Sequence, residues 1–513
     1  MQENQYIFFN TIITNIKTII IVFISFLSSR YLLKALGVDG FGLYNLILGI
    51  SITLEFVITG LTTTTSRFTI LALGKNDTEY SRLVHNTIII ANKKILFWFI
   101  FILQTFGIVM IFWILKIPEG KLITAFVIFE MSVLDSYYKI KVIPYNSLLI
   151  AKENFLFINI VILSAAFLRL GFILLLFVLP FDRLIFYSVI MFIISFMSRQ
   201  ITVIYVSKKY SESKVNHKIY YNQDLFKEIL SFLKFSWIGQ ISNIIKKQGT
   251  NFLLNIFSGN VLLNAAYAAA GQVASISDMA FSPISQAIMP QALKSYSGNN
   301  KPRFKKLTLL NCKLAIILSW IFIIPLLFES DFILHIWLKE VPVFTSQFMI
   351  LILIDEMIRQ LSNGLVISNV VSEKVKVVYL ANMFIQILSF ILSFIFLKCG
   401  MKFWIIFYAN IAVSIIFLFI NLIFSNKYIY INALLYFFRV VIPSAVIGTC
   451  IILLMNLFKT YLSFSSPINS LLIMALSFLL SFILFFVSLF NKEESQKIIS
   501  ITKGTLKNLY TKR

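Results

Sequence analysis

Charged residues are scarce in this chain of 513 residues. Only 13% are Asp, Glu, Lys or Arg, and 59% are apolar, whereas soluble domains have about 25% charged residues. The 45 basic and 22 acidic side chains are too few to form the polar shell of a soluble fold of this length. A spanning helix takes roughly 20 apolar residues, so the composition predicts a polytopic membrane protein. It excludes a soluble enzyme, a secreted scaffold and a disordered chain.

Cysteine and histidine are also rare. The three cysteines lie in separate apolar runs and the three histidines are scattered, so neither a disulfide framework nor a metal site is expected. The chain has no phosphate-binding glycine loop and no nucleophile elbow, which excludes an ATP-driven pump within it. We therefore expect a protein that is not an enzyme and that has no resident cofactor or metal.

Long apolar runs are abundant, and they do not alternate as the strands of a membrane barrel would. The run from Tyr6 to Leu27 lacks a small-residue cleavage site and is expected to be the first span rather than a cleaved signal. Fourteen spans are predicted in all. Their limits are 6–29, 41–65, 95–115, 121–143, 154–179, 184–206, 229–257, 261–290, 307–328, 344–370, 377–397, 402–424, 434–458 and 469–490.

The net charge of +23 is distributed unevenly along the chain. With both termini inside, 33 basic residues fall on the inner side and nine on the outer side. Positive residues concentrate in cytoplasmic loops, so the pattern predicts a multi-pass protein of the bacterial cytoplasmic (inner) membrane with both termini cytoplasmic. The basic excess then needs no nucleic-acid partner.

The polar segment 211–228 divides the chain. It predicts an N-terminal six-helix bundle over residues 1–210 and a second six-helix bundle over 229–430. Two additional helices over 431–492 and a basic tail over 493–513 follow. A weak repeat at a shift of 224 residues places Gly74 opposite Gly298. Because that shift preserves helix orientation, we expect two pseudo-symmetric bundles around a central cavity.

Cations inside predicted spans are the main candidates for function, because an unpaired charge in mid-membrane costs about 2.5–3.5 kcal/mol on insertion scales. Lys17 lies deep in the first span, and Lys246 and Lys247 lie midway along the seventh. With Arg169 of the fifth span, they predict an electropositive interior that binds an anionic group such as a phosphate. The alternative is a later start of the seventh helix, which would leave both of its lysines at the surface.

Acidic residues within the predicted spans are expected to pair with a base or to couple transport to an ion. Asp355 with Arg359, and Asp135 with Lys139, stand four residues apart and are expected to neutralise each other. Glu55 has no basic residue at that spacing. It is the candidate for coupling transport to protons or sodium, and the alternative is a hydrogen bond to the Thr62–Thr65 stretch or to a neighbouring span.

Amide side chains are dense in the seventh and eighth predicted spans. In lipid they must face protein or water, and their number exceeds what helix packing requires. We expect a cavity there that contacts sugar hydroxyls. The candidate substrate-binding amides are Asn251, Asn255, Asn264 and Gln272.

Four segments of the chain are together similar to one transporter family. The segments Arg30–Asn45, Pro144–Asn154, Gln248–Gly259 and Ile336–Lys339 resemble signatures of the Wzx-type polysaccharide or O-antigen flippases, in the expected order over roughly residues 6–430. The shorter matches Asn264–Ala266, Pro290–Ser295 and Pro342 accompany them. These flippases belong to the multidrug/oligosaccharidyl-lipid/polysaccharide exporter superfamily. The chain departs from that pattern at Tyr267, where glycine is common in the family.

The resemblance implies a two-bundle fold of twelve core helices plus two, with a cationic central cavity. It also implies a transporter that flips an undecaprenyl-diphosphate-linked oligosaccharide across the membrane by alternating access, for surface polysaccharide biosynthesis. The expected partners are the lipid-linked oligosaccharide, membrane lipid, and the polymerase and glycosyltransferases of the pathway. Alternatives are a multidrug or organic-cation exporter, a polytopic glycosyltransferase or polymerase, and a flippase for peptidoglycan or teichoic acid precursors.

Overall fold

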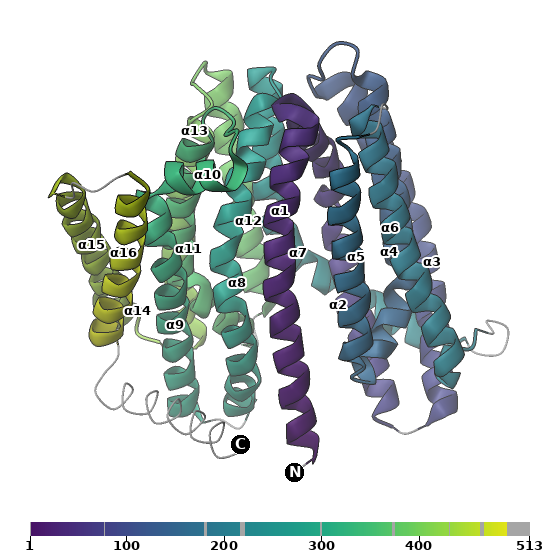
Figure 1. The fold of residues 1–513 in the computed structure, drawn as a ribbon. Coiled ribbons are helices and arrows are strands. Elements are labelled where there is room, and N and C mark those ends of the chain that lie inside the picture. The colour runs from purple at the N-terminus through teal and green to yellow at the C-terminus, as the bar shows by residue number, and fades with distance from the viewer. Residues whose placement is uncertain are drawn as a thin grey trace, which may run out of the picture. The chain divides into compact units, whose positions relative to one another are not determined.

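The computed structural model describes residues 2–75, 77–178, 182–215, 221–297, 300–371, 375–429, 431–461 and 466–489. Over these residues the chain forms sixteen α-helices and no strand (Figure 1). Ten of the helices are long and apolar enough to cross a membrane. This confirms the prediction of an all-α polytopic membrane protein. The predicted basic tail, 493–513, lies outside the described residues.

The chain folds into two compact units. The first comprises residues 1–268, with the short stretches 337–343 and 393–403 packed onto it. Its long helices run side by side, with α4 packed against α2, α3 and α6, and α1 against α5 and α7 (Figure 1). They are α1 (Gln2–Thr53), α2 (Glu55–Leu73), α3 (Thr78–Val109), α4 (Leu122–Ala151), α5 (Phe155–Leu175), α6 (Arg183–Lys209) and α7 (Gln223–Ser258).

The second unit takes the rest of α8 (Leu262–Ser297), whose first residues belong to the first unit. Within it, α11 packs against α9 and α13, and α16 packs against α9 and α15. Its other helices are α9 (Lys301–Phe328), α10 (Ser330–Leu338), α11 (Thr345–Val371), α12 (Val375–Lys398), α13 (Ile405–Tyr428), α14 (Ala433–Tyr436), α15 (Ile442–Tyr461) and α16 (Ser466–Leu489). The domain boundaries expected from the sequence stay predictions.

Two interruptions shape the first 73 residues. Gly37 has φ +73°, a left-handed conformation that glycine adopts without a side-chain clash, and it kinks α1. Leu54, with φ −96° and ψ 8°, separates α1 from α2. The predicted second span, 41–65, is therefore a discontinuous helix, and Glu55 is the first residue of its second segment.

Side-chain caps determine where several helices begin. The Asp182 carboxylate accepts the backbone N–H of Leu184 at 2.9 Å and of Ile185 at 3.4 Å, at the start of α6. Asn222 accepts from Asp224 and Leu225 in the same way at the start of α7. These caps satisfy donors that have no partner within the helix. They locate the start of α6 at Arg183, one residue from the predicted 184, and the start of α7 at Gln223, six residues before the predicted 229. The alternative of a later start of the seventh helix is therefore wrong.

Close helix packing in the first unit depends on small residues. A β-carbon added at Gly42 of α1 would lie 2.1 Å from the carbonyl oxygen of Val261, just before α8. A backbone atom cannot move aside as a flexible side chain does, so only glycine fits at this crossing. In contrast, a β-carbon added at Gly171 of α5 would meet no atom within 4 Å.

The segment after α6 is anchored to the first unit by an ion pair. Lys152 Nζ lies 2.7 Å from Oε1 of Glu212, a buried residue in the short turn Ser211–Ser213. Arg82 of α3 donates to the carbonyl of Ser211 at 3.0 Å. Burial raises the pKa of the Glu212 carboxyl, but the hydrogen bonds from Lys152 and from its own backbone outweigh burial and hold the pKa below its ordinary 4.5.

Substitution of Gly42 by alanine should lower the midpoint of thermal unfolding of the purified protein in detergent. The overlap with Val261 is of the kind that costs about 1–3 kcal/mol. Gly171→Ala is the matched control and should leave the midpoint equal or slightly higher, because alanine favours a helix. Equal midpoints for the two variants would contradict the packing described here.

The Glu212 ion pair predicts a pH-dependent contribution to stability. Because the pKa of Glu212 is lower in the folded state, its contribution is complete above about pH 4.5 and is lost as the pH falls through the folded pKa. The unfolding midpoint of Glu212→Gln should therefore lie below that of the original protein at pH 6, and the gap should narrow by pH 3.5. A gap independent of pH would contradict the assignment.

Candidate functional site: a polar cavity in the first unit

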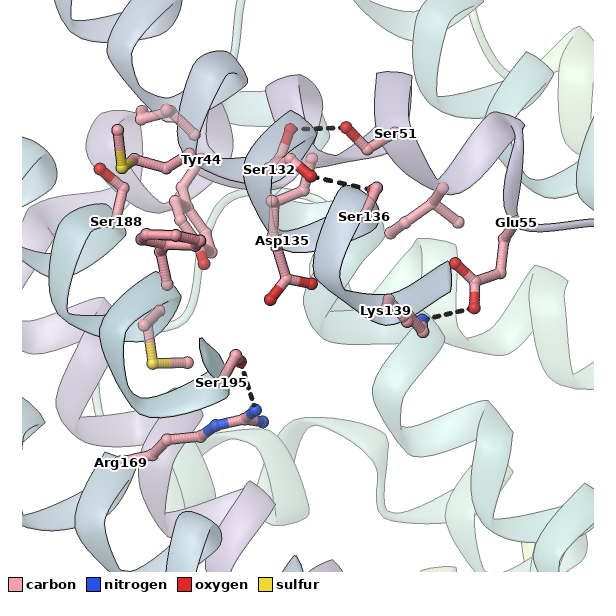
Figure 2. A pocket seen from close by; sticks show the side chains of 16 residues that line it. Tyr44, Ser51, Glu55, Ser132, Asp135, Ser136, Lys139, Arg169, Ser188 and Ser195 are labelled. Atoms are coloured by element: carbon pink, nitrogen blue, oxygen red, sulfur yellow. Dashed lines mark hydrogen bonds and ion pairs between the residues drawn. The ribbon is translucent and has the colours of Figure 1, made fainter. Parts of the chain in front are cut away.

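A polar cavity of about 270 Å³ lies within the first unit, among α1, α2, α4, α5 and α6 (Figure 2). Apolar side chains such as Leu48, Met131 and Phe192 complete its wall. Its polar lining residues are Tyr44, Ser51, Glu55, Ser132, Asp135, Ser136, Lys139, Arg169, Ser188 and Ser195.

Helix α4 contributes one whole face to the cavity. Ser132, Asp135, Ser136 and Lys139 follow the spacing i, i+3, i+4 and i+7, which places them on one side of a helix. Sequence reasoning treated Asp135 and Lys139 as a mutually neutralising pair and did not identify this face. The signal was present as a polar stripe along an otherwise apolar span.

Each acidic residue of the cavity is paired with a base on another helix. Arg199 of α6 holds the Asp135 carboxylate with two bonds, of 2.7 and 3.1 Å, and donates to the Asp135 carbonyl at 3.0 Å. Lys139 Nζ lies 2.5 Å from Glu55 Oε1 (Figure 2). The predicted Asp135–Lys139 pair is therefore wrong. Both residues bind partners on other helices. For Asp135, the guanidinium of Arg199 forms two bonds with the carboxylate, which the ammonium of Lys139 would not.

Arg169 has no acidic partner among the described residues. Its Nη2 donates to Ser195 Oγ at 3.0 Å (Figure 2). Its Nε is buried and makes no hydrogen bond to the described protein. A buried charged donor left unsatisfied is costly. Arg169 is therefore the cavity's uncompensated cation.

Serine hydroxyls of the cavity are mostly committed as donors. Ser136 Oγ donates to the carbonyl of Ser132 at 2.9 Å, and Ser188 Oγ donates to that of Ile185 at 2.8 Å. Ser51 and Ser132 share a hydroxyl–hydroxyl bond of 2.5 Å. A hydroxyl oxygen keeps lone pairs after its proton is used, so these groups can still accept hydrogen bonds.

The other predicted cations do not line this cavity. Lys17 of α1 and Lys246 of α7 are half-buried, and Lys247 is exposed. The backbone carbonyl of Lys247 accepts a bond from the Tyr267 hydroxyl at 3.2 Å. The structure therefore brings only Arg169 of the four into the cavity, and the roles assigned to the three lysines stay predictions.

The predicted sugar-binding amides of α7 and α8 are engaged within the protein. Asn264 Nδ2 donates to both the carbonyl and Oδ1 of Asn251 at 2.7 Å. Asn255 accepts the backbone N–H of Lys116 at 2.8 Å and donates to its carbonyl at 3.0 Å. Gln272 is half-buried. The three buried asparagines thus hold helices and a loop together, and contact with substrate stays a prediction.

The second unit carries its own polar cluster. Arg359 donates through Nη2 to both carboxylate oxygens of Glu356, at 2.8 and 2.7 Å. Gln360 donates to the same carboxylate at 2.6 Å. Asp355, the partner expected for Arg359, accepts from the Ser414 hydroxyl of α13 at 2.5 Å. The sequence predicted an ion pair between Arg359 and Asp355, and the structure shows Arg359 bound to Glu356.

Substitution of Arg199 by glutamine should lower the unfolding midpoint, because it strands the Asp135 carboxylate at a cost of about 1–3 kcal/mol. Asp135→Asn combined with Arg199→Gln should recover part of the loss. Lys227→Gln is the control, since its pair with Asp224 is 3.6 Å long and exposed and should contribute little. A double variant no more stable than Arg199→Gln would refute a specific pair.

No protein-family model and no curated protein matches the chain. Solved structures do match it. It is similar to an inward-facing multidrug resistance MATE family transporter of the MOP superfamily, with a TM-score of 0.64 and 12% identity, covering 77% of this chain and 92% of that one. It is similar to the lipid II flippase MurJ in an inward closed conformation, with a TM-score of 0.63 and 13% identity, covering 94% of this chain and 99% of that one.

A MOP superfamily transporter from Pyrococcus furiosus is also similar, with a TM-score of 0.59 and 11% identity over 81% of this chain and 96% of that one. That structure is described as having a binding pocket of reversed polarity that suggests a different function. At such low identity the likeness concerns the fold. The chain is a multi-pass membrane protein with the fold found in transporters of the MOP superfamily.

Proposed function

We propose that the protein is a transporter that flips an undecaprenyl-diphosphate-linked oligosaccharide across the cytoplasmic membrane by alternating access. The observation that carries the proposal is Arg169, a cation kept in a cavity of the first unit with no acidic partner in the described chain. Arg169 is half-buried, and a cation without an acidic partner in a membrane protein favours an anionic ligand. The proposed substrate is an anionic lipid-linked saccharide, which supplies both negative charge and hydroxyl groups.

The likeness to the lipid II flippase supports this choice because it extends over nearly the whole of both chains. At 13% identity no residue role is carried over from that flippase, so the choice of substrate rests on the charge of the cavity. Lys17, Lys246 and Lys247 are proposed to contact the diphosphate, and the amides of α7 and α8 to contact sugars. Glu55 is proposed for ion coupling, which requires its bond to Lys139 to open during the transport cycle.

Deletion of the gene should make lipid-linked repeat units accumulate on the cytoplasmic side of the membrane. Restored expression of the original protein should clear them, whereas Arg169→Gln should leave export at least tenfold slower at equal protein level. Lys93→Gln removes one charge from an exposed position of α3 and should restore export fully. The measurement is the extracted lipid-linked saccharide, scored for exposure to an impermeant enzyme.

Normal surface polysaccharide in the deletion strain, with no related flippase present, would refute the proposal. Full activity of Arg169→Gln would instead remove the charge argument and leave the fold as the only support. An accumulated peptidoglycan or teichoic acid precursor would assign the flippase to that substrate.

A drug exporter is the second candidate function. Its support is the equal likeness to the MATE transporter and the two carboxylates, Glu55 and Asp135, that line the cavity. An organic cation would need at least one of them released from its basic partner. Drug susceptibility of the deletion strain decides between the two, because an exporter's loss raises susceptibility to cationic drugs whereas a flippase's loss accumulates lipid-linked sugar.

A further inference from the structure

We propose that the cavity of the first unit binds one acidic sugar, with Arg169 and Ser195 holding its carboxylate. This inference rests on the proposed function for the source of the sugar, which would be a unit of the lipid-linked saccharide. It goes further by specifying that the saccharide contains a uronic acid. It also assigns Arg169 to the sugar, whereas the lysines are proposed to contact the diphosphate.

The four charged lining residues and Arg199, the partner of Asp135 just outside the lining, together carry one surplus positive charge. Asp135 is neutralised by the two bonds from Arg199, and Glu55 by Lys139. Arg169 remains, bound only to the neutral Ser195 hydroxyl. A ligand with a single negative charge restores neutrality in a setting where an unbalanced charge is costly.

The hydrogen-bond donors of Arg169 and Ser195 that no protein group uses suit a carboxylate. Arg169 Nε is enclosed by the protein, so the outer nitrogens of the guanidinium are the ones that can meet a ligand. A guanidinium can bind a carboxylate through two parallel bonds. The Ser195 hydroxyl accepts from Arg169, so its own proton is available to a ligand. Figure 2 shows both side chains at one edge of the cavity, which places the two donors together.

The rest of the lining suits the hydroxyls and ring of a sugar. Ser136 and Ser188 have donated their protons to backbone carbonyls, and they offer lone pairs to hydroxyl donors. Met191 and Phe192 add apolar surface beside them, against which the C–H face of a sugar ring can pack. Donors thus lie at the carboxylate end and acceptors along the wall.

Size and charge both restrict the ligand. The cavity of about 270 Å³ is near the lower end of the roughly 300–1,000 Å³ of pockets for drug-sized molecules, a size that suits one sugar unit. A phosphate monoester carries about −1.5 to −2 charges at pH 7, more than one arginine balances. A carboxylate carries −1 and matches.

The test measures binding of sodium glucuronate to the purified full-length protein in detergent, by calorimetry at constant ionic strength. Glucose, acetate and inorganic phosphate are the comparison ligands. Glucuronate should bind at least tenfold more tightly than each of them. Arg169→Gln should weaken glucuronate binding at least tenfold, and Arg169→Lys should fall between, because an ammonium cannot form the paired bonds. Lys93→Gln should bind as the original protein does.

Each comparison ligand can overturn a different part of the proposal. Acetate as tight as glucuronate would remove the sugar from it, and glucose as tight as glucuronate would remove the carboxylate. Tighter phosphate binding would replace the carboxylate with a phosphate. Unchanged glucuronate binding in Arg169→Gln would move the site elsewhere, and the unfolding midpoint of that variant without ligand shows whether it is folded.

The binding experiment and the deletion experiment fail independently. Absent glucuronate binding alongside accumulated lipid-linked saccharide would overturn the acidic-sugar site and leave the flippase. Tight, Arg169-dependent glucuronate binding with normal surface polysaccharide would overturn the flippase and keep the site. Composition analysis of the accumulated saccharide adds a further check, since the proposal requires a uronic acid in it.

Discussion

The cost of keeping a charge away from water governs the arrangement of the first unit. A carboxylate or guanidinium in a low-dielectric region must find an opposite charge or a set of hydrogen bonds. Asp135 finds Arg199 and Glu55 finds Lys139, and both pairs join different helices. The pairs therefore bind α4 to α6 and to α2 through charge, in addition to the apolar contacts between those helices. Arg169 stands out because this rule is not satisfied for it within the described chain.

Helix content and the class of protein could be predicted from the sequence, because the length of each apolar run can be seen along the chain without knowledge of tertiary contacts. Most described helices overlap the predicted spans, but α1 runs from Gln2 to Thr53 across the predicted gap 30–40, and α3 begins at Thr78 rather than near residue 95. The kink at Gly37 and the break at Leu54 were not predicted. No proline marks either position, and a break at leucine has no local signature. What permits it is packing from other parts of the chain, which a window along the sequence does not include.

The candidate site was predicted less well, for the same physical reason. Spacing within one helix suggested Asp135 with Lys139, whereas the structure pairs each with a residue far away in the sequence. The amides Asn251, Asn255 and Asn264 were numerous enough to suggest a sugar-lined cavity, yet they bond to one another and to the backbone of Lys116. Arg169 was found because depth inside a span is visible in the sequence.

Similar folds serve different chemistry among the solved structures that match the chain. A multidrug transporter and a lipid II flippase match it almost equally well, with TM-scores of 0.64 and 0.63. The helical framework thus leaves the substrate open, and the residues of the cavity must decide it. Two charge-neutral pairs and one additional arginine make an arrangement suited to anions, whereas two free acids would suit cations.

All residues lining the cavity come from one unit, and they lie on five of its helices. The residues that determine which ligand the cavity binds therefore lie on a few helix faces. Replacement of Arg169 or of a serine on such a face alters ligand preference without touching the close crossing at Gly42 or the capped helix starts. A change of ligand preference by point substitution therefore leaves the helix packing of the unit in place.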